Sequence, residues 1–157
     1  MSLRVKEFLV IACLMAFVIF INRRDSYRDI DASDILEDIV ENVDIGEMEQ
    51  FNNSDIKKDF GVNANDYDSI VYYGHQSVMN SETLLIIRLA DESQGQDIMD
   101  IIDAQKETNM ELFKSYAPDQ YRLLSESILE QKGSYVLYAV SENAPAIEKA
   151  FSDSITG

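Results

Sequence analysis

The chain contains one histidine and one cysteine, which are the first residues to test for catalytic chemistry. A general base such as His75 needs a nucleophile and an orienting partner within hydrogen-bonding reach. No G-x-S-x-G pattern precedes a predicted helix, and Cys13 lies inside an apolar segment. We therefore expect His75 to be a partly exposed loop histidine, and the sequence predicts no catalytic residue and no cofactor.

Three aspartates, Asp97, Asp100 and Asp103, recur every three residues on a long predicted helix. Residues at this spacing share one face loosely, and carboxylate oxygens are the ligands that hard cations such as Ca²⁺ prefer. The sequence thus offers one candidate metal site. The alternative is a solvated helix face, opposite the isoleucines that the same helix turns inward.

Several of the eight tyrosines fall on predicted strands. Side chains alternate between the two faces of a sheet, so one of the neighbours Tyr72 and Tyr73 should point outward. Exposed strand tyrosines can stack on sugars or form a protein interface, whereas packing on the sheet surface is the alternative. Tyr72, Tyr73, His75 and Tyr135 are our candidate binding surface.

Acidic residues outnumber basic ones, with 29 Asp and Glu against 13 Lys and Arg, for a formal net charge of −16. The first 24 residues are locally basic, so the rest of the chain carries 28 acids against nine bases. A surface this negative repels phosphates and anionic headgroups, which excludes nucleic acid as a partner. A positively charged partner is the class that it favours.

Residues 8–21 read FLVIACLMAFVIFI, fourteen positions without a polar side chain. As a helix they span roughly 21 Å, which is short against a hydrocarbon core of roughly 30 Å. No small-residue cleavage site follows, and a lipidated Cys13 would leave eight apolar residues at the new N-terminus. We therefore expect an uncleaved signal anchor, a transmembrane helix within residues 1–24. Short basic N-terminal tails usually stay in the cytoplasm, so the folded domain is expected on the extracytoplasmic side of the membrane.

After a connector (25–32), residues 33–157 alternate helix-like and strand-like periodicity. The predicted order is α-α-β-β-α-α-β-β-α, which indicates an α+β domain with an antiparallel sheet of about four strands and helices on one face. Helices are expected at 34–43, 54–60, 96–116, 118–124 and from 143, and strands at 69–73, 83–90, 127–130 and 134–140. The expected core includes Leu85, Ile87, Ile102, Phe113, Val136 and Tyr138.

The C-terminal half carries a series of recognisable residues in order along the chain. They are Met79-Asn80-Ser81-Glu82, Gln105, Phe113, Tyr116-Ala117-Pro118, Gly133-Ser134-Tyr135-Val136 and Phe151. This series resembles an uncharacterised family of clostridial envelope proteins, over roughly residues 35–151. The resemblance implies one extracytoplasmic α+β domain behind an N-terminal anchor or lipoprotein signal. It is a domain of unknown function, so the resemblance supplies a fold and no catalytic residue.

Together these patterns predict a non-enzymatic, membrane-anchored binding or accessory domain of the bacterial cell envelope. Its partner would be another envelope protein or a wall polymer. The alternative is an enzyme that acts on envelope glycan through paired carboxylates. Two carboxylates in one deep cleft would favour the enzyme, and a shallow groove would favour the binding domain.

Overall fold

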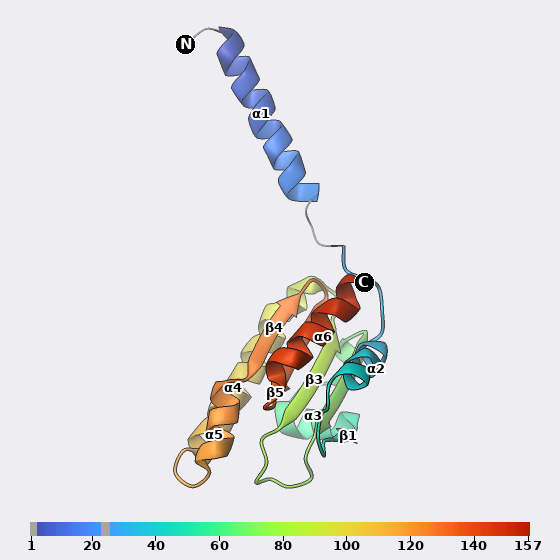
Figure 1. Ribbon diagram of the computed structural model, residues 1–157, viewed down its shortest axis with the longest axis vertical. Helices are drawn as coiled ribbons and strands as arrows, with labels where there is room; N and C mark the ends of the chain where they lie inside the picture. The colour runs from blue at the N-terminus through green and yellow to red at the C-terminus, as the bar shows by residue number, and fades with distance from the viewer. Residues whose placement is uncertain (1–2, 23–25) are drawn as a thin grey trace.

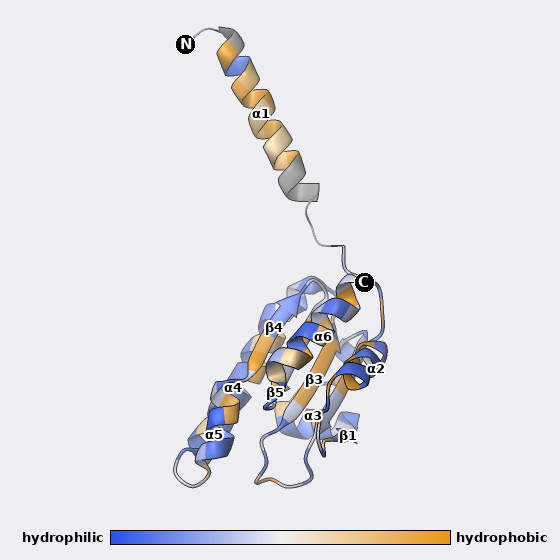
Figure 2. Ribbon diagram, in the orientation of Figure 1, coloured by the Kyte–Doolittle hydropathy of each residue, from blue (hydrophilic) through white to orange (hydrophobic). Residues whose placement is uncertain are grey.

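The computed structural model describes residues 3–22 and 26–157. The first element is helix α1 (Leu3–Asn22), which stands apart from the folded domain and is predominantly apolar (Figures 1 and 2). Its described side chains, from residue 5 to residue 18, are all exposed. Within the part of the chain that the structure describes, no helix combines the length and the apolar character needed to cross a membrane. Residues 1–2 and 23–24 of the expected anchor lie outside the described residues.

The domain is built on one antiparallel sheet of five strands in the order β1-β2-β3-β5-β4. The strands are β1 (Glu49–Phe51), β2 (Ser69–Gly74), β3 (Thr83–Arg88), β4 (Ile128–Lys132) and β5 (Tyr135–Val140). The α+β class is confirmed, but the expectation of about four strands omitted β1. That strand is three residues long and carries two exposed polar side chains, so no β-branched run marked it.

Helices cover both faces of the sheet, so the prediction of helices on one face was wrong. Helices α2 (Ala32–Asn42) and α6 (Ala144–Thr156) pack on one face (Figure 1). Helices α3 (Asn53–Phe60), α4 (Gly95–Phe113) and α5 (Pro118–Ser125) pack on the other. Two 3₁₀ turns, Ala64–Asp66 and Glu92–Gln94, precede β2 and α4. Strand β5 is buried at every position, and a strand buried on both sides needs a layer of helix over each face.

The central strand β3 supplies side chains to both cores. Leu84 and Ile86 face the layer of α2 and α6, whereas Leu85 and Ile87 face the layer of α3, α4 and α5. The expected core is confirmed at each of its six positions, where the side chains are at most 5% exposed (Leu85, Ile87, Ile102, Phe113, Val136 and Tyr138). Alternation along one strand therefore decides which helical layer each residue stabilises.

Short polar residues begin the helices close to the expected positions. Asp31 caps α2 by accepting a hydrogen bond from the Ser33 amide. The Ser33 amide holds the pKa of the Asp31 carboxyl below its usual value. Asn52 caps α3 in a reciprocal capping box with Asp55. Such caps satisfy amides that the first helical turn leaves unpaired.

The segment 26–31, expected to be a simple connector, is fastened to the domain. The Tyr135 hydroxyl accepts a hydrogen bond from the Ile30 amide at 3.0 Å and lies 2.7 Å from the Arg28 carbonyl. The Arg28 amide donates to the Ile155 carbonyl at 2.7 Å, and Asp29 pairs with Arg88. Arg88 ends β3, so the chain enters the domain at that end of the sheet. The loop between β2 and β3 lies at the opposite end (Figure 1).

Candidate functional site

One cleft of about 360 Å³ lies at the end of the domain opposite the entry of the chain. We call it the distal cleft. Its three walls are α3 with the end of β1, the segment that joins β2 to β3, and the C-terminal half of α4. The residues that line it are Phe51, Asp55, Lys58, Asp59, Tyr72, 74–78, 80–83, Gln105, Asn109, Leu112, Phe113 and Tyr116.

A set of local hydrogen bonds fixes the segment 75–82 that forms the second wall. The Asn80 amide nitrogen donates to the Ser77 carbonyl at 3.1 Å, and the Ser77 hydroxyl accepts from the Met79 amide at 3.2 Å. Ser81 is buried, and its backbone amide donates a hydrogen bond to Gln120 Oε1 at 2.7 Å. This bond links the segment to α5. Asn and Ser side chains form such turns readily, so this wall is preorganised.

His75 and Glu82 meet at the base of this wall. His75 Nε2 lies 3.0 Å from Glu82 Oε2, and the two side chains are 14% and 23% exposed. The same oxygen accepts a hydrogen bond from Asn80 Nδ2 at 3.2 Å, while Asn80 Oδ1 accepts from the Glu82 amide at 2.8 Å. The Glu82 carboxylate is thus held by two side chains of its own wall.

Tyr72 forms the floor of the distal cleft. Its ring packs edge-on against Phe51 and Phe60, with centroids 5.0 and 5.4 Å away. Its hydroxyl donates to Asp59 Oδ2 at 2.9 Å. Burial raises the pKa of Tyr72 far above its usual range, and the hydrogen bond to Asp59 adds to the shift. Tyr72 therefore stays neutral near pH 7, where it is a hydrogen-bond donor and not a base.

Gly74 lets the end of β2 approach Phe51 of the first wall closely. A Cβ at this position would lie 3.0 Å from Phe51 Cε2, which is tighter than ordinary contact. Any larger residue would displace the Phe51 ring and, through it, Tyr72. Gly74 is accordingly a close-approach glycine at the end of β2.

Exposed apolar side chains surround the mouth of the cleft. In the described part of the chain after α1, the four most exposed large hydrophobic residues are Val78 (88%), Leu112 (58%), Met79 (54%) and Tyr116 (54%). Val78, Leu112 and Tyr116 line the cleft, and Met79 follows Val78 on the same loop. Apolar groups gathered around one opening are a common feature of interaction sites, whereas single scattered ones are ordinary on a protein surface.

The α4 wall adds amides to the carboxylates of the other walls. Gln105 and Asn109 are one turn apart, and Gln105 Nε2 donates to Asn109 Oδ1 at 3.4 Å. Asp55, Asp59 and Glu82 line the cleft together with Lys58 and His75, so the cleft is acidic on balance. The distal cleft therefore offers a polar interior, rich in acceptors and amides, beneath an apolar rim.

The three aspartates of α4 do not converge. Asp97, Asp100 and Asp103 are all exposed; Asp100 accepts from Gln96 Nε2 at 2.7 Å, and Asp103 pairs with Lys106 at 2.7 Å. Over residues 3–22 and 26–157, no three His, Cys, Asp or Glu side chains are placed to hold a metal ion. These carboxylates form a solvated face with local partners.

The four residues of the expected binding surface lie in different places. Tyr72 and His75 both line the distal cleft. Tyr73 is half-buried on the other face of the sheet, and its hydroxyl lies 3.5 Å from Gln50 Oε1. Tyr135 is 2% exposed and holds the entry segment, so it offers no binding surface. Sequence reasoning did not predict Glu82, Asp59 or the α4 amides as site residues, because no local sequence pattern indicates that three separate elements meet at one cleft.

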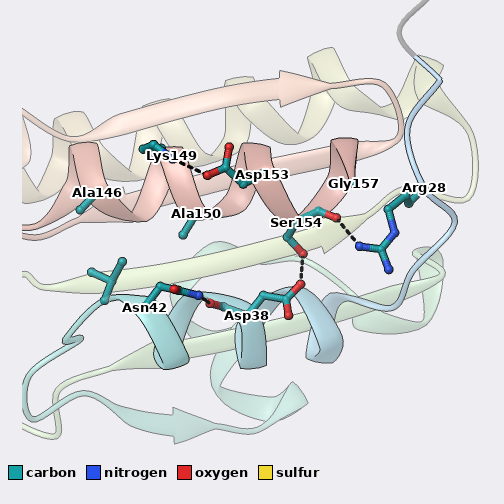
Figure 3. A pocket seen from close by; sticks show the side chains of 10 residues that line it. Arg28, Asp38, Asn42, Ala146, Lys149, Ala150, Asp153, Ser154 and Gly157 are labelled. Atoms are coloured by element: carbon teal, nitrogen blue, oxygen red, sulfur yellow. Dashed lines mark hydrogen bonds and ion pairs between the residues drawn. The ribbon is translucent and has the colours of Figure 1, made fainter.

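A second hollow of about 540 Å³ lies between α2 and α6, beside the entry segment (Figure 3). Ser154 Oγ donates to Asp38 Oδ2 at 2.6 Å, and Arg28 Nη1 donates to the Ser154 carbonyl at 3.2 Å. Lys149 pairs with Asp153 along α6. These bonds join the two helices and the entry segment to one another. The polar side chains around this hollow therefore stabilise the fold.

Comparison with known proteins adds one finding about the extent of the domain. Residues 41–141 match the model of a family described as a domain of unknown function (DUF4358). No curated protein and no solved structure matches the chain. Every residue that lines the distal cleft lies within the matched range, whereas most residues around the second hollow lie outside it.

Proposed function

We propose that this chain, which belongs to the DUF4358 family, is a non-enzymatic binding or accessory domain of the bacterial cell envelope whose ligand occupies the distal cleft. One observation carries the proposal. The most exposed apolar side chains after α1 in the described chain gather at the mouth of a polar cleft that lies within the family's matched range. A concave site with convergent polar groups is the usual form of a ligand site.

The hydrogen bonding within the cleft favours binding over catalysis. Glu82 is engaged by His75 and Asn80, and Asp59 by the Tyr72 hydroxyl. His75 has an orienting partner in Glu82, but among the described residues no hydroxyl or thiol that could act as a nucleophile hydrogen-bonds to His75. A site whose groups are held by the protein is well suited to position a ligand without reacting with it.

We also propose that the chain is held in the cell membrane through residues 8–21, with the folded domain on the extracytoplasmic side. The apolar side chains of α1 from residue 5 to residue 18 are exposed, and burial in lipid would remove them from water. The entry segment docks where β3 ends, while the distal cleft lies where β3 begins, about 17 Å away along the strand. The cleft would then open away from the membrane, toward wall polymer or another envelope protein.

Membrane attachment and orientation are tested together by a single reactive cysteine. Val78→Cys in a Cys13→Ser background places a thiol on a side chain that is 88% exposed. In intact cells a membrane-impermeant maleimide should label this thiol, and the chain should remain in the membrane fraction. Labelling only after the cells are broken, or recovery of the chain in the soluble fraction, would refute the proposed location.

Occupancy of the cleft is tested by a photo-crosslinking amino acid at Val78 in the full chain. We expect an adduct with envelope material that disappears when Tyr116→Ala is added. A crosslinker at Val40, on the exposed face of α2 and 44% exposed, is the matched control and should give no such adduct. Equal adducts at the two positions would refute a site at the distal cleft.

A hydrolase acting on envelope glycan is the second candidate function. It is favoured by one observation, that the three carboxylates Asp55, Asp59 and Glu82 line one cleft. A glycosidase needs one carboxyl group as acid and a second as base or nucleophile. Incubation of the full chain with isolated envelope glycan should release no new reducing ends. Release that is abolished by both Asp59→Asn and Glu82→Gln would establish the enzyme instead.

A further inference from the structure

The chemistry of the distal cleft narrows the class of ligand, provided that the proposed binding function holds. We infer that the cleft binds a short, uncharged segment of a glycan, with one sugar face against the rim at Tyr116 and Leu112 and its hydroxyl groups toward the interior. Three features of the cleft lead to this class: its polar interior, its charge and its apolar rim.

The interior fits a ligand with many hydroxyl groups. Gln105 and Asn109 each offer a carbonyl acceptor and an NH₂ donor, and Asp55 offers carboxylate acceptors. A sugar hydroxyl donates one hydrogen bond and accepts others, so it can satisfy both kinds of group. A volume of about 360 Å³ lies at the low end of the range for small-ligand sites, which suits one or two sugar rings and not a folded partner.

The charge of the cleft selects against acidic ligands. Asp55, Asp59 and Glu82 outnumber Lys58 and His75, and the rest of the domain adds to the negative field. A uronate or phosphate group would enter against this field, whereas an uncharged sugar would not. The field thus disfavours acidic glycans and does not penalise uncharged ones, whose affinity should depend little on salt.

The rim supplies the apolar contact that a sugar face needs. Tyr116 is 54% exposed, and its ring packs against that of Phe113 with centroids 5.7 Å apart, which holds it in place. Leu112 and Val78 complete the rim. Aromatic rings provide a flat, rigid surface on which the C–H groups of a sugar can lie, at low entropic cost. The centre of a protein interface is usually depleted of charge, so the carboxylates and amides inside this cleft fit a sugar better than a protein.

The inference is tested with the full chain in a detergent whose headgroup is not a sugar. The probes are neutral trisaccharides of glucose, galactose, mannose or N-acetylglucosamine, with trigalacturonate as the acidic probe, measured by isothermal titration calorimetry up to about 5 mM. We expect at least one neutral probe to bind, and trigalacturonate to bind at least about tenfold more weakly.

Two variants and one control locate the binding. Tyr116→Ala and Gln105→Leu should each weaken the neutral probe by about fivefold or more. Ile101→Ala, on an exposed apolar residue of α4 outside the cleft, should leave the affinity unchanged. Failure of every neutral probe to bind, equal binding of trigalacturonate, or equal losses in all three variants would overturn the inference. If the photo-crosslink at Val78 persists while no neutral probe binds, the binding function stands and the uncharged glycan is not the ligand.

Discussion

Replacing Leu84 and Leu85 one at a time by alanine tests the presence of a helical layer on each face of the sheet. Both leucines lie on the central strand β3 and are at most 1% exposed, but they belong to opposite cores. Buried Leu→Ala changes cost about 2–5 kcal/mol, through lost transfer free energy and the cavity left behind. Strands β2 and β5 hold β3 on both sides, so the structure can collapse little, and each change should cost about 3–5 kcal/mol.

The free energy of unfolding is measured by urea titration of a chain that begins at Ser26, with circular dichroism as the signal. Val78→Ala, on an 88% exposed side chain, is the control and should lie within about 0.5 kcal/mol of the parent. A loss of about 3–5 kcal/mol would remove a large share of the 5–15 kcal/mol typical of a domain. If one leucine costs this much and the other costs less than about 0.5 kcal/mol, only one face of the sheet is covered and the three-layer arrangement is refuted.

Three further predictions concern the entry segment and the surface charge. A chain that begins at Ser26 should be soluble and should unfold cooperatively. In this chain Tyr135→Phe should lower the free energy of unfolding by about 1–3 kcal/mol, because the Ile30 amide loses its hydrogen-bond acceptor. An unchanged urea midpoint would contradict this role of Tyr135. Asp31→Ala should lower the free energy of unfolding by about 1 kcal/mol at pH 7. Because folding lowers the pKa of Asp31, this loss should be constant at pH values above the ordinary pKa of 3.8 and should fade as the pH falls below that value. A loss that instead grows in acid would contradict the capping role. Added NaCl should raise the melting temperature, because it screens the repulsion between the excess negative charges. CaCl₂ at matched ionic strength should give the same melting temperature. A further rise with CaCl₂ that is lost in Asp100→Asn would reveal a specific cation site on α4.

Regular hydrophobic patterns allowed most elements to be predicted from the sequence. The continuous apolar run of β3 and the helical spacing of Ile98 and Ile102 on α4 were sufficient to place the core. The short strand β1 escaped because Glu49 and Gln50 carry no strand signal, and its pairing with β2 is set by the fold. The periodicity of a single helix also does not indicate which face of the sheet the helix covers. All helices were therefore predicted on one face, although they cover both.

The distal cleft was harder to predict, because its walls are far apart in sequence. His75 was expected in a loop, but its partner Glu82 is brought to it only by the hydrogen-bonded turn between them. Tyr72 and Asp59 meet because α3 packs on β2, a tertiary contact without a sequence signature. Tyr135 was expected on a surface, whereas the docked entry segment covers it. Expected membership of a domain family of unknown function is confirmed over residues 41–141.

Hydrogen–deuterium exchange of the full chain, with and without isolated envelope glycan, tests most directly whether the distal cleft is the binding site. Backbone amides become protected where a ligand covers or orders them, so the method locates the site without prior choice. We predict slower exchange in residues 75–82 and 109–116, and no change in residues 146–157 beside the second hollow. Protection confined to the second hollow would contradict a ligand site in the distal cleft, and unchanged exchange throughout would refute envelope glycan as its ligand.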